Sequence, residues 1–139
     1  MSTPAEIPWD DLRARALAAT VRSYAPYSKV TVGAAGFTTE GHLLEGSNVE
    51  NASYGLTLCA ECSLVSDLVR SGGGRLIAVS IVAGDGEPLA PCGRCRQVLY
   101  EHGGADLLVD AGPERAPTTL GALLPEAFGP GDVAARSNQ

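Results

Sequence analysis

The chain has 139 residues, a length typical of one domain with its own hydrophobic core, and 45% of them are apolar while 19% are charged. Its net charge of −6, with only ten Lys and Arg, disfavours a nucleic-acid partner, because such partners are held through phosphate contacts. No run of 18 apolar residues occurs, and Asp10 and Asp11 interrupt any signal-like segment early. We therefore expect a single cytoplasmic domain over residues 1–139, with no membrane partner.

The N-terminal part of the chain is predicted to form one helix. Residues 1–8 are expected to be a loose arm, and Pro8 suits the start of a helix with acidic residues in its first turn. The apolar spacing carries this helix to about Tyr24, and Pro26 prevents its continuation.

The remaining segments predict a sheet covered by helices. A hairpin with a Thr-Glu-Gly turn comes first, and strands and helices then alternate. In chain order we expect strands over 30–37 and 42–48, a helix over 58–69, a strand over 76–83, a helix over 92–102, a strand over 107–110 and a short helix over 119–124. This order is typical of an α/β domain with helices on both faces of its sheet.

Four cysteines form two pairs, Cys59-x2-Cys62 and Cys92-x2-Cys95, and this spacing indicates metal binding rather than disulfides. Cys59 and the second pair stand where helices are expected to begin, and a helix N-terminus stabilises the thiolate that binds zinc. Three thiolates leave the fourth tetrahedral position of the zinc open for a water of lowered pKa. Glu61, two residues after Cys59, can reach the same cleft and move protons.

Further motifs surround these residues. The stretches are YAPYSK (24–29), VGAA (32–35), NVENASYGLT (48–57), CAE (59–61), PCGRCRQ (91–97) and LLPEAF (123–128). In order and spacing, from about residue 10 to residue 130, they resemble the small homotetrameric zinc-dependent cytidine deaminases.

The resemblance implies a three-layer α-β-α fold with a mixed five-stranded sheet, and one Zn²⁺ per subunit held by Cys59, Cys92 and Cys95. It implies hydrolytic deamination of cytidine and deoxycytidine to uridine and deoxyuridine plus ammonia, in pyrimidine salvage. In such enzymes zinc-bound hydroxide attacks C4 of the base, and the residue that matches Glu61 shuttles the protons.

The same resemblance assigns the substrate contacts. Asn48 and Glu50 are expected to hold the ribose, chiefly its 3′-hydroxyl, and an amide with a carboxylate can both donate to and accept from such a group. The backbone N–H of Ala60 is expected to meet the pyrimidine carbonyl. Neighbouring subunits of a homotetramer are expected to complete each pocket, and Tyr54 and Phe128 match family positions that contribute there.

Two positions depart from the family pattern. Cys62 stands where an Arg usually follows the catalytic Glu, so Arg94 or Arg96 is expected to balance the thiolate charge instead. Val30 stands where an aromatic side chain commonly stacks on the base.

Two alternatives remain open. All four cysteines could close a structural zinc site in a non-catalytic module, because two Cys-x2-Cys pairs are the usual signature of such a site. Glu61 would then be an ordinary solvated carboxylate on a helix surface. Within the deaminases, an enzyme for aminonucleoside antibiotics of the blasticidin type shares the zinc motif, although the stretch 48–51 favours an ordinary nucleoside.

Overall fold

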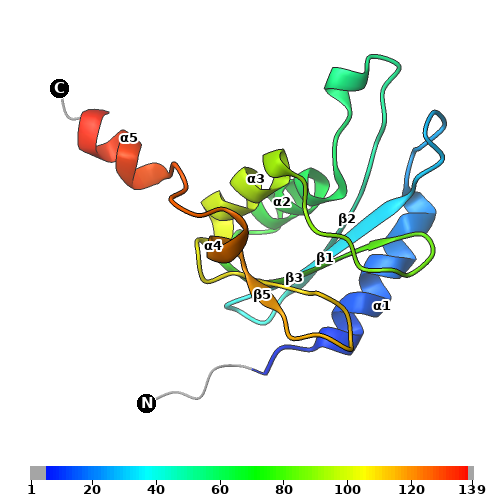
Figure 1. Ribbon diagram of the computed structural model, residues 1–139, viewed down its shortest axis with the longest axis horizontal. Helices are drawn as coiled ribbons and strands as arrows, with labels where there is room; N and C mark the ends of the chain where they lie inside the picture. Colours follow the sequence, from blue (N-terminus) through cyan, green and yellow to red (C-terminus); the bar gives the residue numbers. More distant parts are fainter. Residues whose placement is uncertain (1–5, 138–139) are drawn as a thin grey trace.

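The computed structural model describes residues 6–137, so most of the predicted arm over residues 1–8 lies outside the described residues. Figure 1 shows the helices and strands, coloured in chain order. They are α1 (Trp9–Ala19), the 3₁₀ helix η1 (Thr20–Arg22), β1 (Val32–Thr38), β2 (Leu43–Ser47), the 3₁₀ helix η2 (Tyr54–Leu56), α2 (Ala60–Arg70), β3 (Leu76–Ala83), α3 (Gly93–Gly103), β4 (Leu108–Val109), β5 (Thr118–Thr119), α4 (Leu120–Leu123) and α5 (Pro130–Ser137).

Every helix and strand predicted from the sequence is present, with some shifts at the ends. The first helix ends earlier than predicted, at Ala19, and one 3₁₀ turn completes the run to Arg22. Three elements were not predicted, namely η2, β5 and α5. Among residues 6–137 no helix has both the length and the apolar character needed to span a bilayer.

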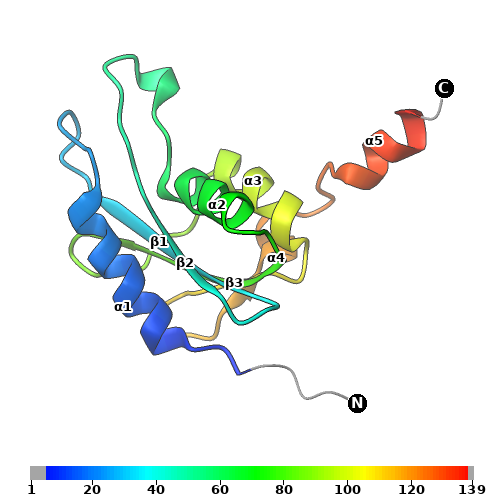
Figure 2. The same cartoon turned by 180° about the vertical axis from the view of Figure 1, so that it is seen from behind.

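The five strands form one mixed sheet in the order β2-β1-β3-β4-β5, in which β3 and β4 are parallel and the other neighbours are antiparallel. Helix α1 covers one face of this sheet, and α2 and α3 cover the other (Figures 1 and 2). The predicted three-layer α-β-α fold with a mixed five-stranded sheet is therefore confirmed. In both views α5 extends away from these layers.

Strand β1 packs against helices on both sides, because successive side chains of a strand point to opposite faces. Ala34 belongs to the core that contains Leu64 of α2, whereas Ala35 belongs to the core that contains Leu12 of α1. Small residues let the helices approach closely. At Gly46 of β2, a methyl group would lie only 2.5 Å from the backbone nitrogen of Leu64. This contact places α2, and therefore everything at its N-terminus, against the sheet.

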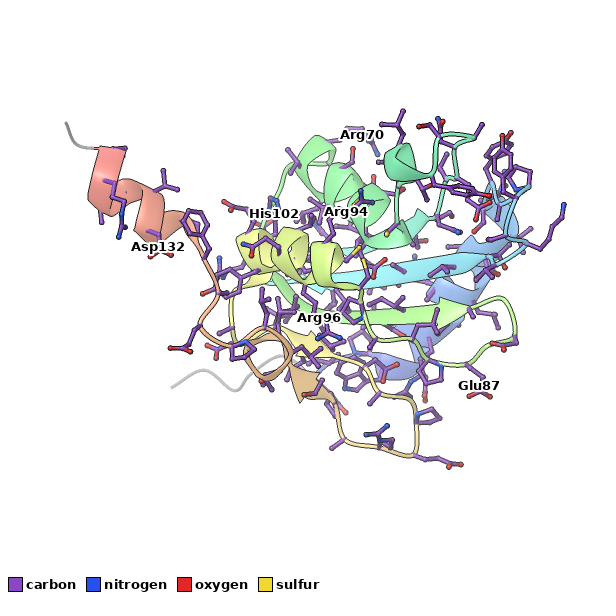
Figure 3. The ribbon with its side chains drawn as sticks, turned by 45° about the horizontal axis from the view of Figure 1, so that its top comes forward. Arg70, Glu87, Arg94, Arg96, His102 and Asp132 are labelled. Carbon is purple, nitrogen blue, oxygen red and sulfur yellow. The ribbon has the colours of Figure 1, made fainter. Side chains whose placement is uncertain are left out.

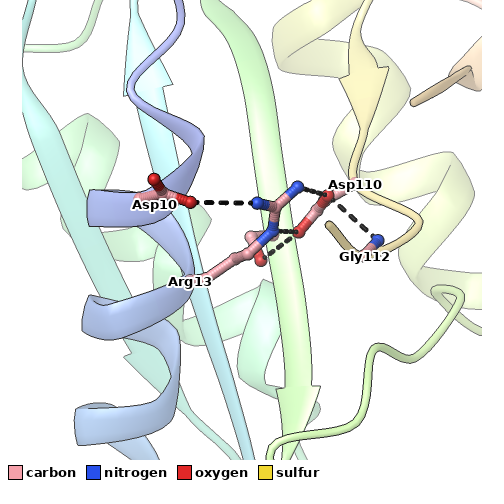
Figure 4. Close-up of polar contacts among 5 residues, drawn as sticks. Asp10, Arg13, Asp110 and Gly112 are labelled. Carbon is pink, nitrogen blue, oxygen red and sulfur yellow. Dashed lines mark hydrogen bonds and ion pairs between the residues drawn. The ribbon is translucent and has the colours of Figure 1, made fainter. Parts of the chain in front are cut away.

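An ion pair ties α1 to the end of β4 (Figure 4). Arg13 donates through Nε and Nη2 to the two carboxylate oxygens of Asp110, at 2.9 and 2.8 Å. The hydroxyl of Ser80 (2.9 Å) and the N–H of Gly112 (3.1 Å) donate to the same carboxylate, which is almost fully buried. Although burial opposes ionisation, these donors outweigh it and hold the pKa of Asp110 below its ordinary value.

Candidate metal centre and pocket

Two helix N-termini converge on one side of the sheet and bring three cysteines together. Cys59 caps α2, Cys92 caps α3, and Cys95 lies in the first turn of α3. Their three sulfur atoms all lie within 4.8 Å of one another, and the Cys59 and Cys92 sulfurs are 3.8 Å apart. Zn–S bonds of about 2.3 Å at tetrahedral angles would separate two sulfurs by roughly 3.8 Å. The cluster predicted from the sequence therefore has the size that a single zinc ion requires.

Cys62 lies outside this cluster. In the described part of the chain, the group of residues able to share a metal ion contains Cys59, Cys92 and Cys95 but not Cys62. Cys62 instead lines an open groove on the outer side of α2, together with Leu58 and Asp67. The geometry thus favours three protein ligands and an open fourth position over a closed four-cysteine site.

Arg94 is the basic residue beside the sulfur atoms. Its Nη2 donates to the carbonyl of Thr57 at 2.8 Å and lies 3.6 Å from the Cys59 sulfur. The Cys59 sulfur raises the pKa of this guanidinium, so the cation is favoured there. Arg96 of α3, labelled in Figure 3, donates to two backbone carbonyls. One belongs to Pro91, just before α3 (2.7 Å), and the other to Leu123 of α4 (2.9 Å).

Of the two arginines considered from the sequence, only Arg94 is therefore placed to balance thiolate charge. Burial raises the pKa of the Cys95 thiol, and the nearby carboxylate of Glu61 raises it further. A divalent cation between these groups would favour their anionic forms, which is the usual coupling between metal binding and thiol ionisation. The donor set therefore suits zinc in its chemistry as well as in its dimensions.

Glu61 occupies the first turn of α2 and is only 4% exposed. Burial raises its pKa above the ordinary value, while the Cys95 thiol and the Arg94 cation act in the opposite direction. A buried carboxyl group with a raised pKa, next to a cluster of metal ligands, is suited to accept and return protons near neutral pH. It is not the solvated helix-surface carboxylate that the alternative interpretation requires.

A cavity of about 180 Å³ opens beside the cysteines. Its walls are mainly apolar with a few polar groups among them, as in many small-molecule sites. It is lined by Val32, Asn48, Thr57, Cys59, Ala60, Glu61, Ile81, Leu89, Ala90 and Cys92. Ala60 is the first residue of α2, where backbone N–H groups have no partner inside the helix and are suited to bind a carbonyl oxygen. Besides two cysteines, three of the predicted site residues line the cavity, namely Asn48, Ala60 and Glu61, whereas Glu50 does not.

Asn48 has a structural role that the sequence did not reveal. Its side chain is buried, its Oδ1 accepts from the N–H of Val32 at 2.8 Å, and its Nδ2 donates to the carbonyl of Val30 at 2.9 Å. The amide therefore fixes the entry to β1, 16 to 18 residues earlier in the chain. No spacing rule in the sequence could have identified this contact.

Glu50 makes a comparable connection to the segment before β1. Its Oε1 accepts from the backbone N–H groups of Tyr27 (3.0 Å) and Ser28 (3.1 Å), and the Ser28 hydroxyl donates to its Oε2. The Ser28 hydroxyl is the largest single influence on Glu50 and lowers the pKa of this carboxyl below its ordinary value. Glu50 is therefore held as an anion and tied to a turn of the chain.

Tyr54 and Phe128 do not line the cavity of their own chain. Tyr54, in η2, is 79% exposed, and Phe128, in the C-terminal segment, is 63% exposed. The Tyr54 ring meets the ring of Tyr27 edge-on, with centroids 6.5 Å apart. The carbonyl of Phe128 accepts a 2.7 Å hydrogen bond from Gln97 of α3. Within one chain these two predicted contacts with substrate are absent from the pocket. Val30, which stands where an aromatic side chain commonly stacks on the base, is about half exposed and does not line the cavity either.

Comparison with known proteins agrees with this geometry. The family model described as the cytidine and deoxycytidylate deaminase zinc-binding region matches residues 9–110. A cytidine deaminase of Mycobacterium tuberculosis (strain H37Rv) is 54% identical over 128 residues, which are 92% of this chain and 95% of the relative. The crystal structure of cytidine deaminase from the same species has a TM-score of 0.85 at 55% identity and covers 89% of this chain and 99% of that one. That from Mycobacterium leprae has a TM-score of 0.83 at 55% identity, covering 87% and 100%.

Proposed function

We propose a reaction for this chain, which belongs to the cytidine and deoxycytidylate deaminase family. The reaction is hydrolysis of the exocyclic amine of cytidine and deoxycytidine, which yields uridine or deoxyuridine and ammonia. The observation that carries it is the position of buried Glu61 in the wall of a small apolar cavity that opens beside the cysteine cluster.

Cys59, Cys92 and Cys95 would hold the zinc, which when bound supplies a Lewis acid that lowers the pKa of a water molecule toward about 7. Glu61 takes one proton from the attacking water and delivers it to the ring nitrogen. It then takes the second proton, from the hydroxyl that the water has left on C4, and delivers it to the amine, which departs as ammonia. The raised pKa of Glu61 suits both directions of transfer, because the group is then neither too weak a base nor too weak an acid. Arg94 holds the loop before α2 through the Thr57 carbonyl and stabilises the Cys59 thiolate.

The cavity would orient the nucleoside. The N–H of Ala60 binds the pyrimidine carbonyl, and Asn48 and Glu50 bind the ribose. A carboxylate offers about four acceptor positions, and the segment before β1 fills three of those of Glu50. One position therefore remains for a sugar hydroxyl. A 3′-hydroxyl is present in cytidine and deoxycytidine alike, so both are expected to react.

A substrate panel followed by ultraviolet absorbance tests this function. Cytidine and deoxycytidine should be converted efficiently, whereas free cytosine should be poor because the sugar supplies binding energy that helps the chemical step. Cytidine monophosphate should be poor because Glu50 would repel its phosphate. Equal kcat/KM on cytosine and cytidine would remove Asn48 and Glu50 from the sugar site. Turnover of a blasticidin-type compound without turnover of cytidine would favour the antibiotic deaminase, and no turnover at all would favour the structural zinc module.

We further propose that the chain acts as a single cytoplasmic domain of a homotetramer in pyrimidine salvage, with pockets shared between subunits. Support comes from Tyr54 and Phe128, large side chains that are left exposed in the single chain. A neighbouring subunit that brought them over the pocket would help to exclude water from it. Symmetric homo-oligomers are also the common arrangement among soluble oligomers.

Mixed assemblies test the shared pockets. Glu61→Gln subunits and Phe128→Ala subunits are each expected to be nearly inactive alone. If the pockets are shared, refolding them together should produce some sites with an intact Glu61 and an intact Phe128, and activity above that of either parent. A fully active monomer at assay concentration would contradict the proposal.

A further inference from the structure

The segment between η1 and β1, residues 23–31, is hydrogen-bonded to the region around Glu50. The backbone of Tyr24 bonds to Asn48 and Glu50, with distances of 3.0 and 2.8 Å. Farther along, a turn closes with the N–H of Lys29 on the carbonyl of Ala25 at 3.1 Å. Lys29 adopts a positive φ of 65°, which turns the chain sharply after Ser28.

Ser28 is at the centre of this turn. Its hydroxyl donates to Oε2 of Glu50. The oxygen of this hydroxyl, Ser28 Oγ, also accepts from the N–H of Val30 at 3.0 Å. Because the N–H of Val30 occupies one side of the oxygen, the hydroxyl proton is directed toward the carboxylate. The N–H groups of Tyr27 and Ser28 hold the other carboxylate oxygen. Both oxygens of Glu50 are therefore fixed before any substrate arrives.

We propose that Ser28 is a positioning residue, which sets the orientation of the Glu50 carboxylate for a hydroxyl of the substrate sugar. This inference rests on the proposed function, in which Glu50 binds the ribose. A carboxylate held by donors on one oxygen only could rotate about the bond between Cγ and Cδ. Substrate binding would then have to fix its orientation, and this entropy cost would reduce the affinity for the nucleoside. The Ser28 hydroxyl removes that freedom and also favours the ionised acceptor, in agreement with the lowered pKa of Glu50.

The test compares Ser28→Ala, Ser28→Thr and a matched control, Ser23→Ala. Ser23 belongs to the same segment, and its hydroxyl also bonds to backbone, at 3.1 Å from the carbonyl of Val32, but it does not contact Glu50. Hydrogen bonds to charged groups contribute enough that Ser28→Ala should raise the KM for cytidine about tenfold. The kcat should change less than about threefold, because the sugar contact is remote from the reacting atoms. Ser28→Thr should restore most of the affinity, and Ser23→Ala should keep the wild-type KM.

A double-mutant cycle separates positioning from general support of the fold. In a Glu50→Gln background, Ser28→Ala should raise KM little further, because its effect passes through the carboxylate. Uridine affinity measured by calorimetry gives the same comparison if turnover of the double variant is too slow to follow. The proposal is overturned if Ser28→Ala keeps the wild-type KM, if its effect is the same in the Glu50→Gln background, or if Ser23→Ala matches it. By contrast, a wild-type protein that leaves cytidine unchanged would overturn the proposed function itself. A Glu50→Gln variant with normal KM would remove Glu50 from the sugar site and overturn the positioning role of Ser28, but not the deamination.

Discussion

Replacing Gly46 with alanine would place a methyl group between strand β2 and the first turns of helix α2. The added carbon would lie 2.5 Å from the backbone nitrogen of Leu64 and 3.0 Å from its Cα, and closer still to the carbonyl oxygen of Ala60. Ordinary contacts of a carbon atom are about 3.5 Å or longer. All three neighbours are backbone atoms, which cannot rotate away. The helix would therefore have to move by about 1 Å, and it carries Glu61 and is preceded directly by Cys59.

The expected magnitudes follow from this displacement. Overpacking of a core costs about 1–3 kcal/mol of stability, so the variant should fold but unfold at a lower urea concentration. A misplacement of catalytic groups by about 1 Å reduces turnover roughly 100-fold, equivalent to about 2.7 kcal/mol in the activation free energy. Turnover of Gly46→Ala should therefore fall much more than its folded fraction does.

The assay measures kcat on cytidine well below the unfolding temperature, with urea unfolding and zinc content determined on the same preparation. Gly36→Ala is the matched control, because its methyl group would meet only the ends of the Leu76 and Leu64 side chains, at 2.9 and 3.3 Å. These side chains can turn aside, so this variant should lose some stability and keep its kcat within about twofold. A folded Gly46→Ala protein with kcat within threefold of wild type would refute the idea that this contact places the catalytic turn.

Three further expectations concern the metal and the fold. Cys62→Ser should retain one zinc per chain by elemental analysis, whereas Cys95→Ser should lose it; equal loss would support a four-cysteine site. Arg94→Ala should weaken zinc binding about tenfold in a chelator competition, the lower end for groups that support metal ligands, and unchanged affinity would show that the contact with sulfur is incidental. Arg13→Gln should cost roughly 2 kcal/mol in urea unfolding at pH 7, less than a full buried pair, because the Arg13 side chain is 23% exposed. Because the pKa of Asp110 is lowered in the folded state, this contribution is present above its unfolded pKa of about 3.9 and is lost as the pH falls through the folded pKa. If the difference in unfolding free energy between wild type and Arg13→Gln stayed constant down to about pH 3, the assignment would be contradicted.

Most of the fold could be predicted because the long elements have strong local signals. The apolar run over 76–83 coincides with β3, and glycines follow the ends of α2 and α3. The pair Thr118–Thr119 could not be recognised as a strand, since two residues show no periodicity and this strand is defined by its pairing with β4. Helix α5, which begins at Pro130, is short and has no buried residue, so it lacks the apolar pattern that marks a packed helix.

The site was predictable to the extent that its residues are close in sequence. Cysteines at two helix starts, with Glu61 two residues after the first, form a local pattern that the tertiary structure then brings together. The choice between Arg94 and Arg96 was not predictable. Two successive positions of a helix amount to a rotation of about 200° about its axis, so Arg94 and Arg96 lie on nearly opposite faces of α3. Only the packing of α3 decides which of the two faces α2. The bonds from Ser28 to Glu50, 22 residues apart, also depend on tertiary structure alone.

The central claim is that Glu61 moves the protons of a zinc-dependent deamination, and Glu61→Gln tests it most directly. Gln has nearly the same shape but cannot accept and return a proton. The variant should keep one zinc per chain and the wild-type unfolding midpoint within error, while kcat on cytidine falls by at least about 10³-fold, since single acid–base groups contribute about 10²–10⁴-fold. A folded, zinc-loaded Glu61→Gln protein that retained more than about a tenth of the wild-type kcat, a loss below about 1.4 kcal/mol, would contradict the account.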